Sequence, residues 1–181
     1  MKLLDRNKTG LVIIDVQEKL MAVMGRRQEA LEGVLNLLRL STLYNIPVIL
    51  TEQYPKWLGP TLPEVRELLP SYGPIEKLHF NCCDVGDFNN RILEEGLERL
   101  IVVGVETHIC VFQTCVSLLE KGYEVHVPRD AVDSRTAENR QVGLDLMKRA
   151  GAIITSVETV IYQILKKAGT KEFKEMLKVV K

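Results

Sequence analysis

The chain of 181 residues contains 46% apolar and 27% charged residues, and its 24 lysines and arginines balance 24 aspartates and glutamates. This composition excludes a disordered or fibrous chain and predicts one globular domain over residues 1–181. The zero net charge disfavours nucleic acids and anionic membranes as partners. The longest apolar runs, 11–14 and 100–103, are far shorter than the roughly 20 residues that cross a bilayer.

The N-terminal residues and the cysteines indicate in which cellular compartment the protein is expected. Residues 1–8 alternate charge with leucine and lack the apolar core and cleavage site of a secretory signal. All four cysteines lie between residues 82 and 115, and Cys82 and Cys83 are adjacent, which is a poor layout for a disulfide framework. We therefore expect reduced thiols and a cytoplasmic protein.

Strand-like and helical segments alternate along the chain. Short apolar, β-branched runs predict strands, and apolar residues at helical spacing predict helices between them. Residues 52–61 include Pro55, Gly59 and Pro60 and predict a long loop. The expected strands are 9–16, 46–51, 75–79, 100–105, 124–127 and 152–155. The expected helices are 28–44, 63–69, 89–95, 107–121 and 137–150, before helical C-terminal segments.

This alternation predicts a three-layer α/β/α domain around a six-stranded parallel sheet of Rossmann-like type, with right-handed crossovers. Ligands of such sheets bind outside the carboxyl ends of the strands, where the strand order reverses. The residues that directly follow strands are therefore the candidates for a functional site.

Asp15 and Cys110 both follow predicted strands. Asp15 ends a run that is apolar enough to be buried, and a carboxylate at such a position needs an explanation. The simplest explanation is that its side chain caps the next turn or helix. Cys110 lies in the first turn of a predicted helix, where free backbone N–H groups and the helix dipole favour a thiolate of lowered pKa. The alternative for Cys110 is a small buried apolar residue.

Lys77 is a weaker candidate on the residues alone. It lies in the strand-like segment Pro74–Phe80, where it shares one face with Ile75 and His79. A lysine in such a segment is more often a solvated surface charge than a catalytic group.

Together these segments resemble the isochorismatase-like cysteine hydrolases over nearly the whole chain. That family has an Asp at the end of the first strand, a Lys at the third, and a Gly-Val-x-Thr-x-x-Cys turn after the fourth. The matching residues here are Asp15, Lys77 and the segment 104–110. The loop 51–60 and the residues around Lys77 are most similar to the subgroup of isochorismatase domain-containing proteins.

The resemblance implies a role for each matching residue. Asp15 would accept the thiol proton, Lys77 would stabilise the thiolate and the ionised Asp15, and Cys110 would attack a carbonyl to form an acyl-enzyme. A cis peptide bond is expected between Val105 and Glu106. It would direct the backbone N–H groups of Glu106 and Cys110 toward the oxyanion.

Other side chains at the same sheet edge are candidates for a substrate pocket, although aromatic and amide residues there are as often packing residues. These are Gln17, Tyr54, Phe80, Asn81 and Thr107. His108 lies two residues before Cys110, and we expect a positional role for it because Asp15 takes the place of the base. The vicinal Cys82 and Cys83 are expected to pack in the core.

No cofactor or metal is expected. Nicotinamidases of this superfamily add a metal site with an Asp and histidines near the loop after the second strand, whereas residues 51–61 contain no histidine. The three histidines, His79, His108 and His126, are too scattered to predict a ligand cluster. A dinucleotide is also disfavoured, because no Gly-x-Gly-x-x-Gly follows any strand.

The sequence thus predicts a metal-independent hydrolase of a small amide, ureide or related carbonyl substrate. Isochorismatase itself cleaves a vinyl ether without a cysteine nucleophile, so Cys110 favours acyl transfer. The alternative is a catalytically silent scaffold that binds a partner. The resemblance also implies a homo-oligomer, for which Tyr54, Trp57 and Leu58 on the long loop offer bulky contact residues.

Overall fold

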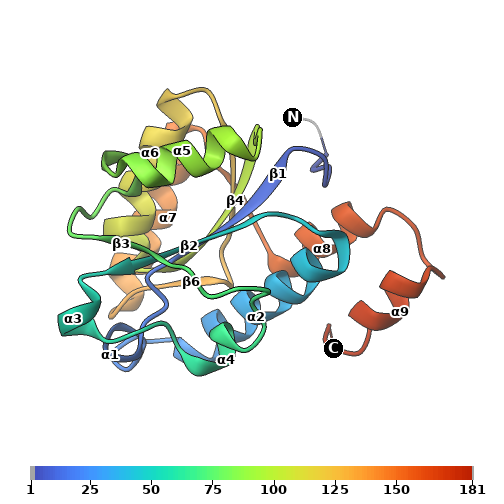
Figure 1. Ribbon diagram of the computed structural model, residues 1–181, viewed down its shortest axis with the longest axis horizontal. Helices are drawn as coiled ribbons and strands as arrows, with labels where there is room; N and C mark the ends of the chain where they lie inside the picture. Colours follow the sequence, from blue (N-terminus) through green and yellow to red (C-terminus); the bar gives the residue numbers. More distant parts are fainter. Residues whose placement is uncertain (1–2, 181) are drawn as a thin grey trace.

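A parallel β-sheet lies in the middle of the molecule, and helices cover both of its faces (Figure 1). The computed structural model describes residues 3–180. The strands run in the order β3-β2-β1-β4-β5-β7, a short β6 pairs with β4, and every pairing between them is parallel. The strands are β1 Thr9–Ile14, β2 Val48–Gln53, β3 Ile75–Lys77, β4 Arg99–Val105, β5 Glu124–Pro128, β6 Val132–Asp133 and β7 Ile153–Thr155.

The helices form the two outer layers (Figure 1). Helices α5, α6 and α7 cover one face of the sheet, α2 and α8 cover the other, and α9 packs against α2. The helices are α1 Glu18–Met21, α2 Arg27–Tyr44, α3 Pro55–Leu58, α4 Pro63–Arg66, α5 Gly86–Glu94, α6 Phe112–Glu120, α7 Ala137–Ala150, α8 Val157–Leu165 and α9 Lys171–Met176. The predicted three-layer architecture with six parallel strands is confirmed, and the two-residue β6 is an addition to it.

The alternation of side chains along the strands creates two apolar cores. On β1, Leu11 and Ile13 join the core under α2 and α8, whereas Val12 and Ile14 join the core under α5 and α6. Both cores are closed to water, which explains why the strand is apolar on both faces. Within residues 3–180, we find no helix with the length and hydropathy of a membrane span.

The strand order reverses between β1 and β4. The chain moves from β1 outward to β2 and β3 on one side, and then returns to place β4 on the other side of β1. Asp15 directly follows β1, and a π-helical turn, Thr107–Val111 (the π-turn), follows β4. The fold therefore brings the two predicted segments together at the edge where open sheets bind ligands.

Several predicted boundaries were shifted by two or three residues, such as strand 75–79, which ends at Lys77, and helix 63–69, which ends at Arg66. Two further differences lie next to the site. The region predicted as a loop from Glu52 to Thr61 begins inside β2, which extends to Gln53, and it contains the short helix α3. Tyr54 has a left-handed backbone (φ 37°), and Pro55 then starts α3 because its fixed φ suits the first helical position. The helix predicted at 107–121 begins instead with the π-turn, and α6 starts only at Phe112.

Gly104 allows β4 to approach β1 directly beside Asp15. Its φ is +111°, in the region that favours glycine, and a Cβ built there would lie 2.0 Å from the carbonyl oxygen of Ile14. No side chain fits this position without moving β1, so the glycine sets the distance between the two strands that position the site.

We expect Gly104→Ala to lower the free energy of unfolding by about 2–4 kcal/mol, because a strained φ and an overpacked contact act together. Denaturant unfolding measures the loss. Gly86→Ala is the matched control, since Gly86 starts α5 and a Cβ there meets no atom within 4 Å. Unfolding curves that coincide for the two variants would contradict the prediction.

Candidate active site

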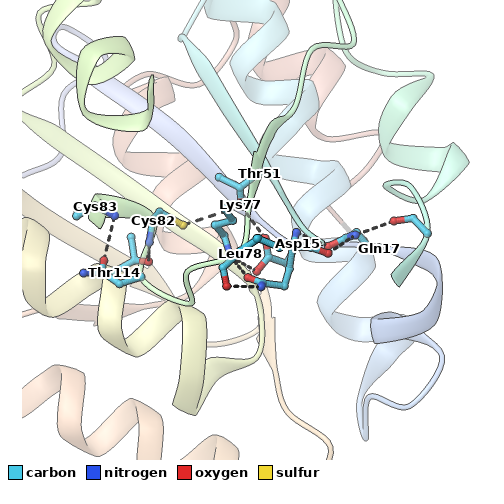
Figure 2. Close-up of polar contacts among 11 residues, drawn as sticks. Asp15, Gln17, Thr51, Lys77, Leu78, Cys82, Cys83 and Thr114 are labelled. Atoms are coloured by element: carbon cyan, nitrogen blue, oxygen red, sulfur yellow. Dashed lines mark hydrogen bonds and ion pairs between the residues drawn. The ribbon is translucent and has the colours of Figure 1, made fainter. Parts of the chain in front are cut away.

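A buried ion pair joins Asp15 and Lys77 (Figure 2). Lys77 Nζ lies 2.6 Å from Asp15 Oδ2, and both side chains are 0% exposed. Thr51 Oγ1 donates a hydrogen bond of 2.8 Å to the other carboxylate oxygen, Oδ1. Lys77 ends β3 and Asp15 follows β1, so the lysine side chain reaches across the end of β2 to form the pair.

The surroundings of these two residues decide between their alternative roles. Both oxygens of Asp15 are taken by Thr51 and Lys77, so the carboxylate does not cap the following helix. Lys77 is buried and is not a solvated surface charge. The backbone of Asp15 has a φ of 54°, a left-handed conformation that Asp tolerates better than most residues.

Cys110 completes the cluster from the other side of β1. It lies in the π-turn after β4, is only 6% exposed, and is near enough to Asp15 for each group to shift the pKa of the other. Helix α7 packs closely against this turn, because a Cβ on Gly143 would lie 2.8 Å from the backbone carbonyl of Thr107. The structure thus brings Asp15, Lys77 and Cys110 together, as the resemblance implied.

The expectation of a lowered thiol pKa was wrong. Burial raises the pKa of the Cys110 thiol, and the neighbouring Asp15 charge raises it further, although the Lys77 charge opposes both effects. The cost of burying a thiolate beside a carboxylate exceeds the favourable effect of the backbone N–H groups of one turn. The resting site therefore holds a neutral thiol that can pass its proton to Asp15.

The charges of the ion pair suit that transfer. Burial raises the pKa of the Asp15 carboxyl group, against the lowering effects of Lys77 and Thr51, which makes Asp15 a stronger base than an ordinary carboxylate. Burial alone would lower the pKa of Lys77, but the neighbouring charge of Asp15 raises it above its ordinary value. Lys77 therefore stays a cation beside the thiol.

The turn that carries Cys110 is fastened through Glu106 and His108. The peptide bond between Val105 and Glu106 is cis, which confirms the prediction. The Glu106 carboxylate accepts hydrogen bonds from the backbone N and the Nε of Arg135, at 3.1 and 3.0 Å. His108 Nδ1 lies 3.0 Å from Ser134 Oγ, so its ring helps to hold the turn.

The five predicted pocket residues lie at this edge but differ in what they can do. Gln17 is not free to bind substrate, because its amide is fully used by the backbone of Gln53 and Gly59. Asn81 is also engaged, through Cys83, Asp84 and Ser117. Tyr54 and Phe80 are exposed, and Thr107 is buried with its hydroxyl unpaired.

Comparison with known proteins shows similarity over almost the full length. The family model described as "Isochorismatase domain" matches residues 9–159. The chain belongs to the isochorismatase domain family. The bovine isochorismatase domain-containing protein 2 is 34% identical over 171 residues, which are 94% of this chain and 82% of the bovine protein.

Solved structures of similar proteins show the same fold. The MAR1 ribonuclease of Caenorhabditis elegans has a TM-score of 0.91 and 34% identity, covering 99% of this chain and 92% of that one. YcaC of Escherichia coli, an octameric hydrolase of unknown specificity, has a TM-score of 0.87 and 27% identity, covering 92% and 84%. These similarities place the chain among the isochorismatase-family hydrolases.

The region in which the sequence analysis looked for metal ligands is held by contacts within the protein. Glu52, near the end of β2, is buried, and its Oε1 accepts hydrogen bonds from the backbone and hydroxyl of Thr61 and from the hydroxyl of Tyr72. Within residues 3–180, no three His, Cys, Asp or Glu side chains are grouped so that they could hold a metal ion. Glu52 instead fastens the loop.

Three residues of this isochorismatase-family site were missed in the sequence. Thr51 and Gln53 are on β2, directly between Asp15 and Lys77, and both bind the ion pair. The third, Cys82, packs beside the site, with Sγ 4.0 Å from Thr51 Oγ1, and burial raises its pKa to about 11. The available signal was the polar run Thr51-Glu52-Gln53 at the end of a predicted strand.

We expect Asp15→Asn to increase the reactivity of Cys110 while it abolishes hydrolysis. The substitution removes the charge that raises the pKa of the thiol and leaves Lys77, which lowers it. At a fixed pH below that pKa, iodoacetamide should label Cys110 faster, by about tenfold for each unit that the pKa falls. Peptide mass spectrometry measures the rate at each cysteine.

Asp87→Asn is the control for this variant, because Asp87 is an exposed residue of α5 and should leave labelling of Cys110 unchanged. Slower labelling of Cys110 in Asp15→Asn than in the unaltered protein would contradict the assigned electrostatic role of Asp15.

Proposed function

We propose that the protein is a metal-independent cysteine hydrolase that cleaves a small amide, ureide or related carbonyl compound. The observation that carries the proposal is the convergence of a thiol, a base and a cation in one buried cluster: Cys110, Asp15 and Lys77. This is the arrangement by which an adjacent base and a neighbouring charge activate a nucleophile.

In the first half-reaction the Cys110 thiol transfers its proton to Asp15, and the thiolate attacks the carbonyl carbon of the substrate. The new C–S bond forms while the carbonyl π electrons move to oxygen, giving a tetrahedral oxyanion. When the oxyanion collapses, the C–N bond breaks and the leaving amine takes the proton from Asp15. Lys77 compensates the negative charge of the thiolate and of Asp15 throughout.

In the second half-reaction water attacks the thioester carbon and gives a proton to Asp15. Collapse of this second tetrahedral intermediate breaks the C–S bond, releases the acid, and returns the proton from Asp15 to Cys110. The overall reaction consumes one water and yields one amine or ammonia and one carboxylic acid. Asp15 thus alternates between base and acid, which a carboxyl group of raised pKa does well.

The backbone N–H groups of Glu106 and Cys110 are the proposed oxyanion hole. Glu106 directly precedes the π-turn and Cys110 lies within its first turn, where a helix leaves its first amides without internal partners. The side chain of Glu106 is held by Arg135, and the backbone of the turn is held by α7, so the donors are fixed before the substrate arrives.

A silent binding scaffold is the less favoured alternative. A buried ion pair contributes little to stability, and apolar residues of similar volume often serve a fold better. A protein without turnover gains nothing from keeping Asp15 and Lys77 buried next to a thiol. RNA, suggested by the relative that is a ribonuclease, is disfavoured by the formal net charge of zero.

A panel of small amides and ureides, assayed for ammonia release with an RNA substrate alongside, tests the proposal. We expect an amide or ureide to be cleaved, and Cys110→Ala to lose activity on the order of 10³-fold or more. Cys83→Ala is the matched control and should retain activity, because Cys83 lies outside the cluster. Activity that survives in Cys110→Ala, or cleavage of RNA alone, would contradict the proposed chemistry.

We also propose that the chain self-associates through α3 and the loop around it. Trp57 is 68% exposed, and Lys19 holds it in place by a hydrogen bond of 2.6 Å to its carbonyl, with the ammonium 5.3 Å from the ring centroid. Tyr54 is exposed beside it, whereas Leu58 is partly buried. The octameric relative supports assembly of this kind.

Trp57→Ala should lower the mass of the protein in solution, because it removes the largest apolar side chain that this surface offers to a neighbour. Light scattering coupled to size exclusion measures the mass. Leu93→Ala on α5 removes an equally exposed apolar residue, also 68% exposed, and should leave the mass unchanged. An unchanged mass for Trp57→Ala would rule out this surface as the contact.

A further inference from the structure

The side-chain amide of Gln53 connects the Lys77 ammonium to the end of β3. Gln53 Oε1 accepts a hydrogen bond of 2.8 Å from Lys77 Nζ, and Gln53 Nε2 donates one of 2.9 Å to the backbone carbonyl of Leu78. Gln53 is the last residue of β2, is buried, and is paired in register with Lys77. It lies on the strand that Lys77 crosses to reach Asp15.

The partner at each end of this side-chain amide determines whether the amide group there must accept or donate a hydrogen bond. An ammonium group can only donate a hydrogen bond and a backbone carbonyl can only accept one, so the orientation of the amide is fixed by its two partners. A carboxylate of the same length would leave the Leu78 carbonyl without its donor, and a methionine would leave both partners unpaired. Glutamine is therefore the side chain that satisfies both groups.

Gln53 is itself held in place by Gln17. Gln17 Oε1 accepts from the backbone N of Gln53 at 2.8 Å, and Gln17 Nε2 donates to the carbonyl oxygens of Gln53 and Gly59, at 3.0 and 2.6 Å. All of these groups are buried or nearly so, where hydrogen bonds are strong and loss of a partner is costly. The amide of Gln53 thus presents a rigid acceptor to Lys77.

This rigid acceptor determines where the cation can act. Of the three N–H bonds of the Lys77 ammonium, one is directed to Asp15 and one to Gln53, so the direction of the third is set by tetrahedral geometry. Without Gln53, the ammonium could rotate and move toward Asp15 alone.

We propose that Gln53 is a positioning residue for the hydrolase reaction: it holds the Lys77 ammonium between Asp15 and Cys110 so that one N–H remains available to the thiolate. The inference rests on the proposed function. Gln53 acts through Lys77 and does not contact the substrate, so its loss should lower kcat and leave KM nearly unchanged.

The test compares Gln53→Glu and Gln53→Met by the pH dependence of iodoacetamide labelling of Cys110, followed by peptide mass spectrometry. In Gln53→Glu the added carboxylate competes with the thiolate for Lys77, so the labelling midpoint should move to higher pH, by about one unit. In Gln53→Met the charge is unchanged, so the midpoint should stay near that of the unaltered protein.

The same variants are assayed on the amide found active. We expect kcat of Gln53→Met to fall about tenfold with KM within about twofold, as expected for loss of one hydrogen bond to a charged group. Gln141→Glu and Gln141→Met are the matched controls, because Gln141 is exposed on α7 and should change neither readout.

The outcomes separate this inference from the proposed function. If Gln53 only joins β2 to β3, its substitution should change stability but not the two readouts. A labelling midpoint of Gln53→Glu and a kcat of Gln53→Met at the control values would therefore overturn the inference and leave the proposed function standing. If Gln53→Glu does not fold, the kcat and KM of Gln53→Met alone test the positioning role of Gln53. If Cys110→Ala keeps the amide activity of the unaltered protein, both the inference and the proposed function are wrong.

Discussion

The buried ion pair between Lys77 and Asp15 is the constraint on which the site depends. Because the strand order is β3-β2-β1, the lysine must cross the end of β2, and the residues there must be able to bind charged groups. Thr51 and Gln53 meet this requirement with one hydrogen bond each to the pair. A buried ion pair is stable only when its remaining donors and acceptors are satisfied, and here β2 supplies those partners.

The same carboxylate has opposite effects on the thiol at rest and during reaction. Its charge raises the pKa of Cys110, which keeps the resting thiol neutral, and its raised basicity lets it accept the proton when a carbonyl is in place. Reactivity in this isochorismatase-family site thus depends on the whole cluster. A thiol of this kind reacts slowly with stray electrophiles, in contrast to the thiolate that a helix end alone would produce.

The fold and part of the site followed from local patterns, because alternating strands and helices determine the layers and strand ends determine where Asp15 and Cys110 lie. Lys77 needed the family resemblance, since a lysine in a short strand carries no signal of burial. Thr51 and Gln53 were missed because their role depends on the spatial order of the strands. The choice between pocket and packing stayed open for Gln17 for a related reason, since its partners are backbone groups of a distant segment that no sequence pattern reveals.

The fastening of the loop after β2 has a consequence for access to Cys110. Gln17 clamps Gln53 and Gly59, and Glu52 clamps Thr61, so the segment between β2 and α4 is tied near both of its ends. A segment fixed in this way has little freedom to close over Cys110, so the loop loses little conformational entropy when a molecule binds there.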